Sequence, residues 1–146
     1  MQHVSKDLLY LLRILEAIEK IMLYSKEYKT PEEFFFTNDQ KDYNASLLLM
    51  IQIGEQSSKI SGELKQKFSD IKWQEVKGFR NRVVHDYANI DTLMVFSIIK
   101  NDLPLLILQI SLCIKEQIKN NAFNITELEI SKGSLFYQHI NFSLLK

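Results

Sequence analysis

The sequence is poor in the residues that make chains flexible or cross-linked. Its 146 residues include four glycines, two prolines and a single cysteine, Cys113. The scarcity of glycine and proline argues against long flexible linkers, and the length suits one domain. A lone cysteine excludes an internal disulfide, and its apolar neighbours predict a buried thiol. With no recognisable signal peptide, these features predict a reducing, cytoplasmic setting.

Net charge and hydropathy argue against some classes of protein without pointing to a particular function. Lys and Arg total 18 and balance 18 acidic residues, so the overall charge does not indicate a nucleic-acid binder. No run approaches the ~20 apolar residues of a membrane span, which predicts no membrane contact. The charge is unevenly placed, however, because seven basic and three acidic residues lie between Lys59 and Arg82. This excess could be an ordinary solvated helix face or part of a functional surface.

Hydrophobic periodicity predicts an all-α domain over residues 1–119. Apolar residues recur at three- and four-residue steps from Ser5 to Tyr28. Thr30 and Pro31 predict the start of a short helix that ends near Phe36. A long helix is predicted over residues 39–60, followed by a short helix ending near Phe68 and a third helix starting at Ser69 or Asp70. A last helix is predicted to begin after the capping residue Asp91 and to end near Lys119. Pro104 should kink or split it near Asp102.

The predicted helix 39–60 is apolar on nearly every side between Ala45 and Ile53. Such a helix must be covered all round, either by its own chain or by a second subunit. Gly54 lies within it and predicts close approach by another part of the chain. Residues 120–146 differ in character and form a C-terminal extension, packed on the helical domain or on a partner subunit. Alternation around Leu128, followed by a turn-like sequence, predicts a short β-hairpin there.

Residues 80–87, Arg-Asn-Arg-Val-Val-His-Asp-Tyr, carry the most chemical content. Because a helix turns by about 100° per residue, His85 should lie nearly opposite Phe79 and therefore off the core. Arg80 should lie about 140° round the axis from His85. The two side chains could converge through the long reach of arginine, through a distorted helix, or through a twofold axis joining two copies.

This combination of residues suits phosphate chemistry. Histidine exchanges protons near neutral pH, and arginine holds phosphate oxygens through parallel hydrogen bonds. Together they could cleave RNA: the 2′-hydroxyl attacks its own phosphate, His85 handles a proton, and an arginine stabilises the pentavalent charge. No cofactor is expected, and no metal-ligand spacing connects His3, His85 and His139.

The motif and its surroundings resemble the HEPN superfamily, in its HepT toxin branch. Arg80-x4-His85-x-Tyr87 resembles the Arg-x4-His-x-Tyr motif of that branch. The similarity covers roughly residues 7–118 and includes Leu15 to Ile21, Ile53-Gly54-Glu55, Trp73-x4-Gly78-Phe79-Arg80-Asn81, and Val95 to Pro104.

This resemblance implies an antiparallel helical bundle that forms a homodimer, with the two motifs facing a shared cleft. It implies a metal-independent endoribonuclease toxin of a type II-like toxin–antitoxin pair, with RNA as substrate and Arg80 and His85 as the catalytic pair. It implies that a cognate MNT-type nucleotidyltransferase antitoxin attaches AMP to Tyr87, adding bulk and negative charge. The residues expected to support the site or bind phosphate are Asn81, Arg82, Asp86 and Glu55.

The chain departs from the family pattern in two places. Leu48-Leu49 stand where relatives often carry Arg-Asn, and the extension after about Asn120 lies outside the pattern. A second interpretation is a non-catalytic module whose motif clamps a nucleotide or a protein partner. A third, a structural helical dimer with a decayed site, is disfavoured by the intact motif.

Overall fold

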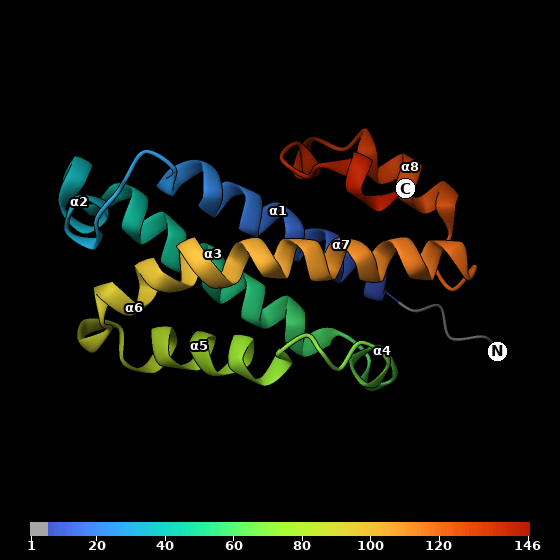
Figure 1. The fold of residues 1–146 in the computed structure, drawn as a ribbon, viewed down its shortest axis with the longest axis horizontal. Coiled ribbons are helices and arrows are strands. Elements are labelled where there is room, and N and C mark those ends of the chain that lie inside the picture. Colours follow the sequence, from blue (N-terminus) through green and yellow to red (C-terminus); the bar gives the residue numbers. More distant parts are fainter. Residues whose placement is uncertain (1–5) are drawn as a thin grey trace.

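Residues 6–146, the part that the computed structural model describes, fold as an up-and-down bundle of helices (Figure 1). No strand occurs in this range, which confirms the predicted all-α class. Ser5 and His3, which entered the sequence predictions, lie outside the described residues. The α-helices are α1 (Asp7–Ser25), α2 (Pro31–Phe36), α3 (Lys41–Lys59), α4 (Gly62–Lys67), α5 (Trp73–His85), α6 (Thr92–Ser97), α7 (Leu103–Lys119) and α8 (Ile125–Lys132).

Side-chain caps fix several helix starts where the sequence predicted them. The Thr30 hydroxyl accepts a hydrogen bond from the Glu33 amide at 3.2 Å, and the Asp91 carboxylate accepts one from the Leu93 amide at 3.0 Å. Two starts fall later than predicted. Helix α3 begins at Lys41 because residues 38–40 take left-handed φ values, between 51° and 66°. Helix α5 begins at Trp73 rather than at residue 69 or 70.

Helix α3 lies between α1 and α5, so most of its apolar surface is covered by its own chain. Leu47, Met50 and Ile53 are buried. Leu48 is the exception, with 58% of its surface exposed. The chain itself therefore covers the sides of α3 that face α1 and α5. Leu48, on the outer side, remains exposed to solvent.

The fourth long helix of the bundle bends between α6 and α7, near Asp102, where Pro104 was predicted to kink or split it (Figure 1). A π-helical segment, Ile98–Asp102, joins α6 to α7, and the Leu103 amide donates to the Ile98 carbonyl one residue further back than in an α-helix. Proline cannot donate to the preceding turn, and the wider turn accommodates it. By length and composition the continuous helix Thr92–Lys119 could cross a membrane, contrary to the expectation that no such run exists. One third of its most apolar window is buried within the bundle.

The predicted β-hairpin in residues 120–146 is wrong. Asn124 caps α8 by accepting a hydrogen bond from the Thr126 amide at 2.7 Å, and the segment continues as a helix. Leu128 is 1% exposed, whereas Ile130 is 73% exposed, so the apparent alternation reflects a single inward side chain. The extension lies along α1 in Figure 1, where the His139 amide and its Nδ1 meet the Glu16 carboxylate at 2.6 and 2.7 Å.

Candidate active site

Helix α5 carries Arg80 and His85 of the Arg-x4-His-x-Tyr motif, and it packs closely against α3 at Gly54. A Cβ atom added to Gly54 would lie 2.2 Å from the Arg80 Cβ and 2.7 Å from its Cγ. Only glycine leaves room there for the stem of the arginine. The close approach predicted from Gly54 is thereby confirmed, and its partner is the motif arginine itself.

The guanidinium of Arg80 is held from two sides. Its Nη2 donates to Glu55 Oε1 at 3.1 Å, and its Nη1 donates to Asn81 Oδ1 at 3.1 Å. Its Nε is buried and has no hydrogen-bond partner among the described residues. Of the residues predicted to support the site, Glu55 and Asn81 thus contact Arg80 directly. They fix a side chain that would otherwise lose considerable conformational entropy when it binds an anion.

His85 is the last residue of α5 and is exposed to solvent. Helix geometry separates it from Arg80 by about 140° around the α5 axis. The His85 side chain has no hydrogen bond or ion pair with any of residues 6–146. The helical-wheel prediction that His85 lies off the core is confirmed, and a single copy of the chain does not bring His85 and Arg80 together. Arg82 is also exposed, and its Nη1 lies 3.2 Å from Met94 Sδ.

The turn after α5 is stabilised by two side-chain contacts. The Asn89 side-chain Nδ2 donates to Asp86 Oδ1 at 2.8 Å, so Asp86 helps to hold the turn. The Tyr87 hydroxyl donates to Asn44 Oδ1 in a short hydrogen bond. Asn44 was not predicted as a site residue, because it precedes Tyr87 by 43 positions and only the crossing of α3 and α5 unites them.

The same crossing defines a surface beside the motif, which we call the α3–α5 face. It consists of Asn44, Leu48 and Glu55 from α3 with Arg80 and Val84 from α5, and the Tyr87 and Arg80 contacts tie its two edges together. Leu48 and Val84 are 58% and 43% exposed, so this face combines the motif with uncovered apolar surface.

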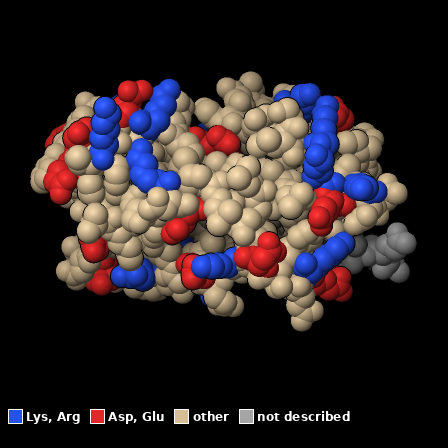
Figure 2. Space-filling model, viewed as in Figure 1, with Lys and Arg blue, Asp and Glu red and all other residues tan. Residues whose placement is uncertain are grey.

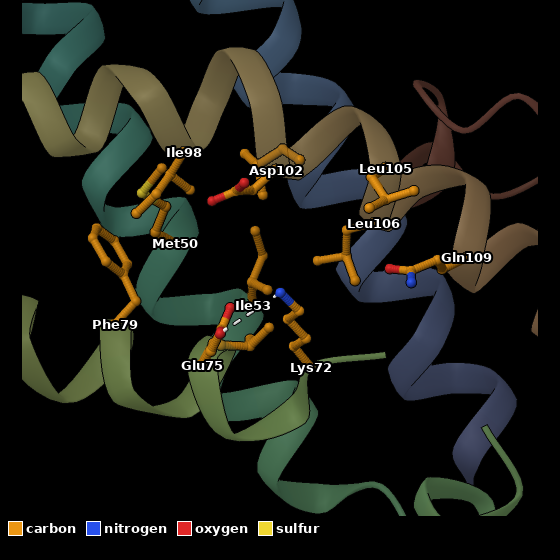
Figure 3. Close-up of a pocket in the computed structure, with 12 residues that line it drawn as sticks. Met50, Ile53, Lys72, Glu75, Phe79, Ile98, Asp102, Leu105, Leu106 and Gln109 are labelled. Atoms are coloured by element: carbon orange, nitrogen blue, oxygen red, sulfur yellow. Dashed lines mark ion pairs between the residues drawn. The ribbon is translucent and has the colours of Figure 1, made fainter. Parts of the chain in front are cut away.

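A separate hollow of about 190 Å³ lies on the other flank of α5, toward α7 (Figure 3). Met50, Ile53 and Phe79 form part of its apolar wall, and the ion pair between Lys72 and Glu75 lies at its edge. Neither Arg80 nor His85 lines it. The hollow therefore lies where α3, α5 and α7 meet and is separate from the motif residues Arg80 and His85.

Charge does not gather into one patch on the face seen in Figure 2. Lys and Arg lie toward both ends, and a largely uncharged band crosses the middle, where α7 runs in Figure 1. Helix α7 has three strongly exposed leucines, Leu105, Leu108 and Leu112. Within residues 6–146 no group of three His, Cys, Asp or Glu side chains is arranged to hold a metal ion.

An all-α bundle with this motif at the end of its third long helix has the features of the HEPN superfamily. The family model of HepT-like ribonucleases matches residues 14–112, which is more than half of the chain. The chain therefore belongs to the HepT-like ribonuclease family, and ribonuclease is the class of enzyme to which this family assigns it.

Individual relatives agree with the family model. A protein of Thermococcus cleftensis named as a probable ribonuclease HepT is 31% identical over 104 residues, which is 71% of this chain and 90% of the relative. A Methanocaldococcus jannaschii protein named as a candidate RNase is 30% identical over 65% of this chain and 84% of the relative.

A longer M. jannaschii protein, named as a gamma-glutamylcyclotransferase and candidate RNase, is 32% identical over 84% of this chain. The match covers only 55% of that relative. No solved structure gives a significant match.

Proposed function

We propose that the chain is a metal-independent endoribonuclease toxin of a cytoplasmic toxin–antitoxin pair, active as a homodimer. RNA binds between the two motifs, and Arg80 holds the scissile phosphate. The 2′-oxygen attacks phosphorus, the bond to the 5′-oxygen breaks, and the products are a cyclic phosphate and a 5′-hydroxyl. His85 transfers the proton that leaves the 2′-oxygen or reaches the 5′-oxygen, and Arg80 stabilises the charge that develops on phosphorus.

One observation supports the homodimer above all: among the described residues Arg80 and His85 share no hydrogen bond or ion pair, and their five-residue spacing places them about 140° apart around the α5 axis. Arg80 is tied to Glu55 on α3, whereas His85 is exposed and unpartnered among the described residues. A twofold axis beside the α3–α5 face would place the arginine of one copy near the histidine of the other. The exposed Leu48 and Val84 on this face would be covered by the same contact. In this proposal Arg82 contributes further positive charge for RNA.

The proposed partner is an MNT-type nucleotidyltransferase antitoxin that attaches AMP to Tyr87. Tyr87 is 53% exposed at the end of the motif, so a transferase could reach its hydroxyl. The phenol oxygen would attack the α-phosphorus of a nucleoside triphosphate, pyrophosphate would leave, and the hydroxyl proton would pass to solvent. The added phosphate would carry negative charge at the end of the motif, where it would oppose the entry of RNA.

The test is cleavage of total RNA by the purified chain, with and without EDTA. Wild type is expected to cut RNA equally well in both, and His85→Ala is expected to lose about 10²-fold or more in rate. Because the His85 side chain is exposed and makes no hydrogen bond or ion pair with any of residues 6–146, the variant should melt within about 1 °C of wild type. Equal cleavage by wild type and His85→Ala would refute the proposed role of His85. Saturable nucleotide binding without any RNA product would favour the binding-module interpretation instead.

A further inference from the structure

The turn after the motif helix is attached to α3 by one side-chain hydrogen bond. The Tyr87 hydroxyl donates to Asn44 Oδ1, and both side chains are exposed. The tyrosine ring is not buried, so packing alone does not fix its position. The direction of Tyr87 therefore depends on the acceptor that Asn44 supplies.

Helix α3 thus holds the motif at both ends. Glu55 fixes Arg80 near the middle of α5, and Asn44 fixes Tyr87 just beyond its end. His85 lies between these two attachments, is exposed, and makes no side-chain hydrogen bond or ion pair with any of residues 6–146. Its orientation is set by the backbone from Arg82 to Tyr87, where the Asp86 amide donates to the Arg82 carbonyl at 2.9 Å.

We propose that Asn44 is a positioning residue, which holds the Tyr87 hydroxyl and thereby sets the direction in which His85 points. This inference rests on the proposed function, in which His85 transfers a proton during RNA cleavage. It assigns a role to an α3 residue outside the Arg-x4-His-x-Tyr motif. The same inference assigns a role to the Tyr87 hydroxyl in the unmodified enzyme, as the donor of the hydrogen bond to Asn44.

One consequence concerns any substituent on the Tyr87 oxygen. Once that oxygen carries another group, it has no proton to donate, and the Asn44 carbonyl loses its partner. Modification of the hydroxyl would then release the turn from α3, in addition to blocking the cleft. Replacing Tyr87 by phenylalanine removes the same proton without adding bulk or charge, so it isolates this effect.

The first measurement is the rate of RNA cleavage by the full chain at saturating substrate. Asn44→Ala and Tyr87→Phe should each lower kcat about fivefold, which is what one hydrogen bond of ordinary net strength contributes. The double variant should lose no more than either single one, because both changes remove the same interaction. Asn44→Asp keeps an acceptor and should stay within about twofold of wild type. Asn120→Ala, an exposed asparagine at the far end of α7, is the matched control and should match wild type.

The second measurement is amide hydrogen exchange, which does not depend on activity. The amides of Asp86, Asn89 and Ile90 donate to backbone carbonyls within the turn. Their exchange should speed up about fivefold in Asn44→Ala and in Tyr87→Phe, and should remain slow in Asn44→Asp. Unchanged exchange in Asn44→Ala and Tyr87→Phe would show that the hydrogen bond between Tyr87 and Asn44 does not stabilise the turn, and would overturn the inference.

The two measurements separate this inference from the proposed function. Faster exchange with unchanged cleavage would overturn the positioning role while leaving the ribonuclease assignment intact. Losses that multiply in the double variant would also overturn it, because the two residues would then act separately. Absence of cleavage by wild type would refute the proposed function, and the positioning role would fall with it.

Discussion

Replacing Gly54 by alanine tests the close packing of α3 against the motif helix. The new Cβ would lie 2.2 Å from the Arg80 Cβ and 2.7 Å from its Cγ, well inside normal contact distance. The Arg80 Cβ is attached rigidly to the α5 backbone, so rotation of the side chain cannot relieve the overlap. Helix α5 must move away from α3.

Two opposing terms set the size of the effect. Alanine is a better helix former than glycine by about 1 kcal/mol, which would stabilise α3. Overpacking of a close helix contact costs about 1–3 kcal/mol. Because the overlap falls on the rigid Arg80 Cβ, we expect the packing cost to lie in the upper part of this range, about 2–3 kcal/mol, so that the free energy of unfolding falls by about 1–2 kcal/mol in total. For a chain of this size that corresponds to a fall of roughly 2–8 °C in Tm. RNA cleavage should fall as well, because the shift separates Arg80 from Glu55.

Gly78→Ala is the matched control, since Gly78 also lies within a helix. A Cβ added there meets nothing within 4 Å, so the variant should be stabilised by about 0.5–1 kcal/mol. Thermal unfolding of both variants, followed by circular dichroism, gives the comparison. If Gly54→Ala were stabilised as much as Gly78→Ala, the account of the α3–α5 contact would be wrong.

Three further predictions concern other parts of the chain. Glu55→Gln should slow RNA cleavage several-fold but change stability by less than about 1 kcal/mol, because the ion pair with Arg80 is partly exposed; a stability loss as large as the activity loss would contradict this. Leu128→Ala should lower the free energy of unfolding by about 2–5 kcal/mol and Ile130→Ala by less than about 0.5 kcal/mol, measured by chemical denaturation. Similar losses for the two variants would instead fit a hairpin with both residues on one face. Burial raises the pKa of the Cys113 thiol to about 12, so a thiol reagent at pH 8 should label it only after unfolding, and labelling of the native chain would show that the helix opens.

Much of the helical bundle could be predicted because its signals are local. Thr30 and Asp91 predict helix starts because their side chains can cap a helix, and both caps are present in the structure. The exposure of His85 followed from helix rotation alone, since the core side of α5 is fixed by Val83. The close approach at Gly54 was also predictable, although the sequence could not say which residue approaches.

The features that could not be predicted depend on how distant elements meet. The contact between Asn44 and Tyr87 exists only because α3 and α5 cross in one register. A β-hairpin was wrongly predicted in the C-terminal extension because Leu128 and Ile130 are two positions apart, a spacing typical of strands. In the absence of a neighbouring strand in the described chain, the segment satisfies its backbone groups as a helix capped by Asn124.

Subunit complementation tests the central claim most directly. Arg80→Ala and His85→Ala are each purified, shown to be inactive on RNA, and then mixed in equal amounts under conditions that allow subunit exchange. If one site takes its arginine and its histidine from different copies, about half of the dimers are mixed and each has one intact site, so about a quarter of wild-type activity should return. A mixture no more active than the separate variants would contradict the account, because the two residues would then have to come from the same chain.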